Sequence, residues 1–362
     1  MTEPLTLVEV PAAPAKGRRV TPTAYLLLPA DAPREQWLAA RRGDWRDGTT
    51  RIGSSDVADI LGVGSRTPAH VYYDKRGELG DDDAGEAALW GHLHEETIAR
   101  EWARRNRSVV RRIGLVAHVE RPWMTCTLDR QVHECPLDRN ERGRCALEIK
   151  TRSAWVAGRW LRAVPDDVLA QVLWQAAVTG YDHVHVAVLI GGNDYRQYTV
   201  YAAEYRDVIT NMITAADAMR RRIIAGDPPP SAEAAGDHPD RLVELYDRLH
   251  PDRSGAVEAP LEAIGLIDEY ERHRLAEAEH RKAKERAKAQ LIALLGDAEM
   301  AHADGYPVYA YTAQRGRPAV DLARLAEEYP EAYAACVRET TTRRLSIAKP
   351  YRKSSPKSSE ES

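Results

Sequence analysis

The chain has 362 residues, 43% of them apolar, which is enough to bury the core of one large domain or two smaller ones. No apolar run approaches the roughly 20 residues of a membrane-spanning helix, so we expect a soluble, cytoplasmic protein with no membrane partner. A net charge of −4 does not by itself predict a nucleic-acid partner.

The first predicted elements are short and precede one long helix. Residues 1–22 are rich in Ala and Pro without periodicity, which predicts a flexible N-terminal arm. Ser54 or Ser55 is placed to cap a short helix, and Pro68 opens a second one. Apolar residues then recur at helical spacing over residues 86–106, which predicts a long amphipathic helix.

Strand-like runs, a helix and a hairpin follow this long helix. Alternating or continuous apolar runs bounded by polar loops are typical of strands, and a 3.6-residue period indicates the helix. Helices beside a mixed sheet predict an α/β domain over residues 23–226. The strands are expected at 113–119, 123–129 and 145–150, the helix at 166–180, and the hairpin at 183–203.

The rest of the chain predicts a smaller appended module. The Pro-rich stretch 227–240 is typical of a linker. A long, highly charged helix with a narrow apolar stripe, two strand-like pieces and two short helices then predict a helical α+β module over residues 241–349. The low complexity of residues 350–362 predicts a disordered tail.

The strand at 145–150 carries an acid and a base on one face. Side chains alternate along a strand, so Glu148 and Lys150 point the same way. Asp129 ends the preceding predicted strand, so its carboxylate and that of Glu148 could converge on Mg²⁺ or Mn²⁺. Lys150 beside the metal would position an attacking water or offset charge on a phosphorane. The alternative interpretation is an ordinary ion pair between Glu148 and Lys150.

Asp129 followed by Glu148-Ile149-Lys150 resembles the PD-(D/E)xK nuclease core. The flanking segments resemble the YqaJ-type viral recombinase family, relatives of phage lambda exonuclease, over about residues 35–205. This resemblance implies a PD-(D/E)xK restriction-endonuclease-like core, a central mixed sheet flanked by helices. The flanking motifs, in the family's order, are IGSSDVADILG, WGHLHEETIAREW and VPDDVLAQVLWQAAVTG.

The resemblance also implies roles for individual residues. Asp129, Glu148 and the carbonyl of Ile149 would bind the metal. Lys150 would act on the nucleophilic water, and Glu95 would complete the acidic cluster directly or through water. We therefore expect Glu95, Asp129 and Glu148 around one Mg²⁺ or Mn²⁺ site.

Further residues are implied in binding DNA. Gln171 would hydrogen-bond substrate or fix the lysine, and Ser55 suits a phosphate of the DNA. The family uses an arginine to capture the 5′-phosphate, but the insertion GDWRDGTT departs from the family pattern here and leaves the choice open. The candidate arginines are Arg41, Arg42, Arg46 and Arg51.

These features predict a metal-dependent exodeoxyribonuclease of phage-type recombination in a bacterial host. It would digest one strand of linear double-stranded DNA from the 5′ end and leave a 3′ single strand for a phage single-strand annealing protein. The resemblance implies a ring-shaped homotrimer, although the charged helix could change the oligomer. Two alternatives stay open: a structure- or site-specific endonuclease of the same fold, and a non-catalytic DNA-binding protein.

Three of the four cysteines flank the proposed site. Some nucleases of this superfamily carry an iron–sulfur cluster, but that pattern needs a cysteine group after the core, where only Cys336 is available. The cysteines are also too few and too irregularly spaced for a disulfide framework. We therefore expect buried, reduced thiols at Cys126, Cys135 and Cys145.

Overall fold

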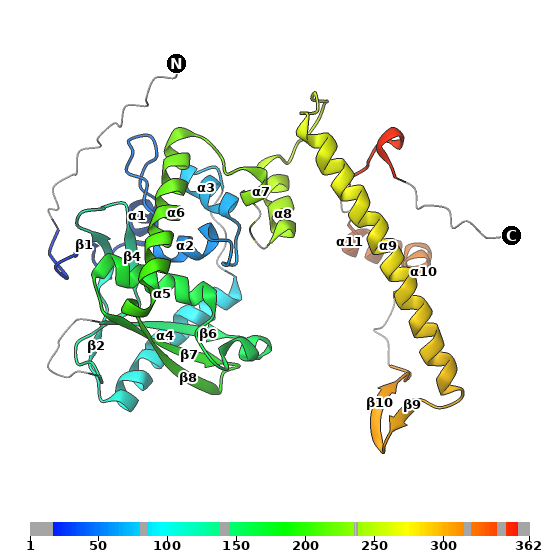
Figure 1. The fold of residues 1–362 in the computed structure, drawn as a ribbon, viewed down its shortest axis with the longest axis horizontal. Helices are drawn as coiled ribbons and strands as arrows, with labels where there is room; N and C mark the ends of the chain where they lie inside the picture. Colours follow the sequence, from blue (N-terminus) through cyan, green and yellow to red (C-terminus); the bar gives the residue numbers. More distant parts are fainter. Residues whose placement is uncertain are drawn as a thin grey trace. The chain divides into compact units, whose positions relative to one another are not determined.

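The computed structural model divides into two compact units, residues 1–253 and 254–362 (Figure 1). Most of the predicted N-terminal arm and disordered tail, residues 1–16 and 354–362, lies outside the described residues. Among the residues that are described, no helix has both the length and the apolar character needed to cross a bilayer. The described residues are 17–79, 85–137, 145–234, 236, 238–314, 320–338 and 345–353.

Two sheets form the frame of the first unit. The smaller is antiparallel, in the order β1-β3-β4, and the larger is mixed, in the order β2-β5-β6-β7-β8. In the larger sheet β6 and β7 are parallel and every other neighbouring pair is antiparallel. The strands are β1 (Ala24–Leu28), β2 (Val110–Arg111), β3 (Gly114–His118), β4 (Thr125–Leu128), β5 (Arg130–Val132), β6 (Cys145–Arg152), β7 (His183–Ile190) and β8 (Asp194–Tyr201).

Helices cover both faces of the five-stranded sheet (Figure 1). Trp102 of α4 packs with Leu147 of β6 on one face, whereas Leu173 of α5 packs with Val186 of β7 in the core on the other. The predicted fold class, a central mixed sheet flanked by helices, is confirmed. The helices are α1 (Arg34–Arg42), α2 (Ser54–Ile60), α3 (Pro68–Arg76), α4 (Glu86–Asn106), α5 (Asp166–Thr179), α6 (Arg206–Ala225), α7 (Ser231–Ala234) and α8 (Pro239–Leu249), with 3₁₀ turns η1 (Ala154–Trp160) and η2 (Ala202–Tyr205).

Two local predictions differ from the structure. The short β5, which was not predicted, pairs with β6, and its Arg130 lies opposite Leu147. Three residues with a single apolar side chain give too weak a pattern to predict β5. Neither Ser54 nor Ser55 caps α2; Gly53 precedes the helix, and its N–H donates to Asp56 Oδ2 at 2.8 Å.

The first unit extends past the predicted linker at residues 227–240. Helices α7 and α8 come from this region and the start of the predicted module, and they contribute Ala234 and Leu245 to a small apolar cluster with Ala69 of α3. Leu245 is fully buried there. This contact ties α8 to the first unit, which runs to Arg253.

The second unit consists mainly of one long helix, α9 (Glu262–Leu295), with nearly all of its side chains exposed. One exception is Glu271, whose carboxylate accepts hydrogen bonds from Arg274 and from the N–H of Lys353. The other elements are β9 (Met300–Ala303) paired antiparallel with β10 (Tyr306–Ala310), α10 (Leu322–Glu328), α11 (Pro330–Cys336) and the 3₁₀ turn η3 (Lys349–Tyr351).

Candidate active site

Asp129 lies at the joint between β4 and β5, where the chain leaves the three-stranded sheet for the five-stranded one. Its Oδ2 accepts a 2.7 Å hydrogen bond from the N–H of Ile149, which ties the joint to β6. Burial raises the pKa of Asp129 well above its usual range, and the nearby Glu148 carboxylate raises that pKa further. Positive charge placed beside the two acids would favour the ionised form of Asp129.

Glu148 is almost completely buried and has several donors around its carboxylate. Its Oε1 accepts hydrogen bonds from the Lys150 ammonium and, at 2.6 Å, from Gln171 Nε2. Its Oε2 accepts one at 2.7 Å from Gln175 Nε2. A carboxylate offers about four lone-pair positions, so these three donors orient Glu148 and leave capacity for a further ligand.

Helix α5 supplies both glutamines from one face. Gln171 and Gln175 are four residues apart, so they lie one above the other on the helix and both face β6. Gln171 Oε1 also accepts a 2.8 Å hydrogen bond from Lys150 Nζ, so the Gln171 amide contacts both charged residues of the strand. Gln171 was predicted for this place; Gln175 was missed, although its spacing from Gln171 was the available signal.

Glu95 of α4 reaches this region through an ion pair with Arg130. Arg130 directly follows Asp129 and is buried, and it also binds Glu96 at 2.8 Å. The charge of Glu95 contributes to the raised pKa of Asp129, so the two acids are electrostatic neighbours. Sequence reasoning missed Arg130; the signal available was an arginine adjacent to a candidate ligand.

A polar pocket of about 670 Å³ adjoins Gln171. Ser55 and Arg41 lie in it, and Arg41 Nη2 donates to Ser55 Oγ. Gln171 lines the pocket and also accepts a hydrogen bond from Lys150, so this residue links the pocket to the Glu148 site. The other charged or polar lining residues are Asp59, Ser65, Arg66, Asp74, Arg152, Arg159 and Asp167.

Buried charges beneath the pocket hold its arginines. Asp56 is fully buried and forms ion pairs with Lys75 at 2.7 Å and Arg41 at 3.2 Å. Arg66 lies 3.7 Å from Asp56 and 3.0 Å from Asp59. Burial opposes ionisation of Asp56, but Lys75, Arg41 and Arg66 outweigh it and hold the pKa of Asp56 below its usual range. The guanidinium groups are thus positioned before any ligand binds.

The other candidate arginines lie elsewhere. Arg42 pairs with Asp74 at 3.4 Å, and Arg51 donates to the carbonyl of Ala40 at 2.9 Å. Arg46 is exposed and pairs with Asp44 at 3.5 Å. None of these three is among the residues that line the pocket, whereas Arg41 and Ser55 are. The structure brings one arginine and one serine of the predicted group to the site.

The donor set at Asp129 and Glu148 fits a hard divalent cation. Carboxylate oxygens on adjacent strands are the ligands that Mg²⁺ and Mn²⁺ take in proteins, usually one or two per ion with waters completing the shell. The carboxylate of Glu148 raises the pKa of Asp129. A cation bound between the two acids would offset this repulsion. Lys150 lies beside them with a donor directed at Glu148.

Residues 36–182 match the model of the YqaJ-like viral recombinase domain. Over 329 residues the chain is 26% identical to the uncharacterized protein YqaJ of Bacillus subtilis (strain 168), covering 88% of this chain and 95% of that protein. That second match therefore continues well beyond the domain.

Solved structures give weaker likenesses. An alkaline exonuclease from Laribacter hongkongensis, LHK-Exo, is 17% identical with a TM-score of 0.43, over 53% of this chain and 94% of that one. A phage-related exonuclease from Haemophilus somnus 129PT is 11% identical with a TM-score of 0.34, over 49% and 96%. Over residues 36–182 this chain is similar to YqaJ-like viral recombinase domains.

Proposed function

We propose that this protein is a metal-dependent exodeoxyribonuclease that degrades one strand of linear duplex DNA from the 5′ end. The observation that carries the proposal is that Asp129, between β4 and β5, lies near Glu148 of β6, whose carboxylate contacts the ammonium of Lys150. The YqaJ-like viral recombinase domain spans all three residues and supports a role in recombination. The product would be a 3′ single strand for annealing.

The chemistry follows from the residues on the two strands. A bound Mg²⁺ or Mn²⁺ would stabilise charge on the scissile phosphate and acidify a water. Asp129 and Glu148 would hold the ion, with the Ile149 carbonyl as a third ligand. Lys150 would donate a hydrogen bond to the nucleophilic water and offset negative charge in the transition state. Gln171 accepts a hydrogen bond from the Lys150 ammonium and so holds it in place. Glu95 would act on the ion through water, because Arg130 already holds it.

The adjoining pocket is proposed to hold the 5′-phosphate of the DNA end. Arg41 and Ser55 offer a guanidinium and a hydroxyl side by side, which is a geometry suited to phosphate oxygens. Arg66 lines the same pocket and adds positive charge. Because the pocket meets the Glu148 site at Gln171, a terminal phosphate bound there would place a nearby phosphodiester at Lys150.

The decisive experiment compares four DNA substrates in the presence of Mg²⁺. Linear duplexes labelled at the 5′ or 3′ end, a duplex lacking the 5′-phosphate and a closed circle are incubated with the full chain. We expect release of nucleotides from the 5′-labelled linear strand, slower release without the phosphate, and no activity in a chelator. Cutting of the closed circle would instead identify an endonuclease, and digestion from the 3′ end would reverse the proposed polarity.

A Lys150→Ala variant tests the catalytic assignment. Its DNA degradation is expected to be lost while duplex binding in Ca²⁺ is retained. Unchanged degradation by this variant would place any activity elsewhere and leave a DNA-binding role. The proposal also includes a homotrimer, which light scattering of the pure protein tests. It includes a single-strand annealing partner as well, which is tested by whether an annealing protein from the same genome co-purifies with this chain.

A further inference from the structure

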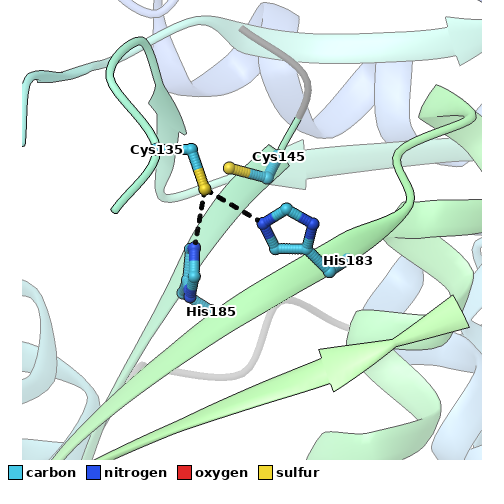
Figure 2. A group of neighbouring side chains, drawn as sticks. All are labelled: Cys135, Cys145, His183 and His185. Carbon is cyan, nitrogen blue, oxygen red and sulfur yellow. Dashed lines mark hydrogen bonds between the residues drawn. The ribbon is translucent and has the colours of Figure 1, made fainter. Parts of the chain in front are cut away.

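A second group of metal-binding side chains lies at the start of the same central strands. Cys145 is the first residue of β6, His183 and His185 lie on β7, and Cys135 follows β5. Figure 2 shows the four side chains directed toward one another. The parallel register that pairs Cys145 with His183 puts three of them on one face of the sheet, because residues two apart on a strand share a face.

This group is separate from the candidate active site. Cys145 precedes Glu148 by three residues on β6, so their side chains point to opposite faces of the sheet. Cys135 and Cys145 belong to the core that lies under α4 with Trp102, whereas Glu148 is bound by residues of α5. A ligand held by the cysteines would therefore not touch the proposed catalytic residues.

The spacing of the four side chains fits one tetrahedral ion. Cys135 Sγ lies 3.2 Å from His183 Nε2 and 3.5 Å from His185 Nε2. The potential ligand atoms of all four residues lie within 4.8 Å of one another. With Zn–S distances of about 2.3 Å and Zn–N distances of about 2.0 Å, ligand atoms of a tetrahedral site are about 3.3 to 3.8 Å apart. Only a small contraction would complete the site.

The surroundings also orient the ligands. Cys135, Cys145 and His185 are buried. His185 Nδ1 lies 3.0 Å from Thr199 Oγ1 on β8, so a proton on Nδ1 has an acceptor and Nε2 is left to bind a metal. A hydrogen bond from the second ring nitrogen is the usual support of a metal-binding histidine. Trp102 packs against the same imidazole at 5.1 Å between ring centres and fixes its plane.

We propose that Cys135, Cys145, His183 and His185 bind one Zn²⁺ ion. Two thiolates and two imidazoles in a tetrahedral arrangement are ligands that zinc prefers, and four protein ligands leave no open position for substrate. The ion is thus structural: it joins the end of β5 to the starts of β6 and β7. It braces the strand that carries Glu148, and its existence does not depend on the proposed nuclease activity.

The geometry distinguishes zinc from the other thiol chemistries. In a [2Fe–2S] centre with two cysteines and two histidines, the cysteines bind one iron and the histidines the other. Here the single thiol of Cys135 lies within 3.5 Å of both imidazoles, as around one ion. Cys135 and Cys145 are also free thiols rather than a disulfide. The expectation of buried, free thiols at these two positions is confirmed.

Metal analysis of the full chain tests this site. The protein is produced with added zinc, kept reduced, passed over a chelating resin and analysed by mass spectrometry for metals. We expect about one zinc per chain, and loss of zinc in Cys135→Ser and Cys145→Ser. Cys126→Ser, another buried thiol, and Cys336→Ser, an exposed one, serve as matched controls and are expected to keep the ion. Asp129→Asn is also expected to keep it, since that residue belongs to the other site.

Two further measurements keep the test sharp where a cysteine variant fails to fold. His185→Cys preserves four ligands and is expected to retain zinc, whereas His185→Ala loses it. Replacement of zinc by Co²⁺ in the wild-type chain should give the charge-transfer and d–d bands of a tetrahedral thiolate site. The proposal would be overturned by a folded, reduced wild-type chain that holds no zinc, or that holds iron with labile sulfide instead. A native Cys135–Cys145 disulfide, or zinc retained after both Cys135→Ser and Cys145→Ser are made in one chain, would overturn it as well.

Discussion

Gln175 Nε2 lies 2.7 Å from Glu148 Oε2 and 3.3 Å from the carbonyl of Thr127. The amide therefore uses its donors on a buried carboxylate and a backbone oxygen. Its own Oε1 is buried without a hydrogen-bond partner among the described residues. An amide that leaves its acceptor unpaired in this way is placed for its donors, which fix the orientation of Glu148.

Replacing Gln175 by Leu should therefore destabilise the protein and weaken its activity. The change removes a donor to a buried charged group, a bond with a contribution of about 1.5 to 3 kcal/mol. Urea unfolding of Gln175→Leu should show a loss of this size, with reduced nuclease activity in the remaining folded fraction. Gln197→Leu, on the exposed part of β8, is the matched control and should change the unfolding free energy little. Equal effects of the two variants would remove the special role of Gln175.

Lys150→Met should abolish DNA degradation while leaving the fold intact. The methionine keeps much of the side-chain volume but removes the ammonium that donates to Glu148 and Gln171. Loss of a group that positions or activates a nucleophilic water costs about 10²- to 10⁴-fold in rate. Single-turnover digestion of a 5′-labelled duplex measures the effect, and circular dichroism checks the fold. The exposed Lys284→Met of α9 should digest DNA at the wild-type rate.

The sequence predicted which residues belong to the site better than it predicted the contacts between distant segments. Asp129, Glu148 and Lys150 were placed by the strand pattern, and Gln171 by the resemblance to the YqaJ family; the structure brings the four together. Arg130 was missed because its role depends on α4 lying over β5. A burial pattern identifies an element's inward face, but it does not say which distant residue meets that face.

The same limit applies to the group around Cys135. Its thiols and imidazoles come from a loop and two strands, with 47 residues between Cys135 and His183, and neither histidine stands in a familiar zinc spacing. Only the parallel register of β6 and β7 brings Cys145 beside His183. The alternation in HVHVAVLI predicted a strand correctly, but it gave no reason to read its two histidines as ligands.

Arg41→Ala should reduce the preference for a 5′-phosphate. Arg41 contacts Ser55 in the pocket that meets Gln171, and a lost guanidinium–phosphate hydrogen bond costs about 1.5 to 3 kcal/mol, or roughly 10- to 100-fold. The measurement is the ratio of kcat/KM on duplexes with and without the terminal phosphate. Arg46→Ala is the control, since Arg46 is exposed and pairs with Asp44 outside the pocket. If the ratio were unchanged in Arg41→Ala but lowered in Arg46→Ala, the phosphate would instead bind at the insertion of residues 43–50, which contains Arg46.

Asp56 should give the fold a distinct dependence on pH. The ion pair with Lys75 is buried, so Asp56→Asn leaves an unpaired ammonium and should cost about 3 to 5 kcal/mol at neutral pH. The pKa of Asp56 in the folded chain lies below its ordinary value of 3.8, because Lys75, Arg41 and Arg66 outweigh burial. A depressed folded pKa contributes stability that is complete above the unfolded value and is lost as pH falls toward the folded one.

The difference in unfolding free energy between wild type and Asp56→Asn should therefore stay constant from neutral pH down to about 3.8 and shrink below it. Thermal unfolding at a series of pH values measures this difference. Asp227→Asn is the control, because that exposed carboxylate pairs with Arg222 on the surface and should shift stability by less than about 1 kcal/mol at any pH. A difference that instead grew on acidification would mean that Asp56 is protonated in the folded protein, and the pocket arginines would then need another anchor.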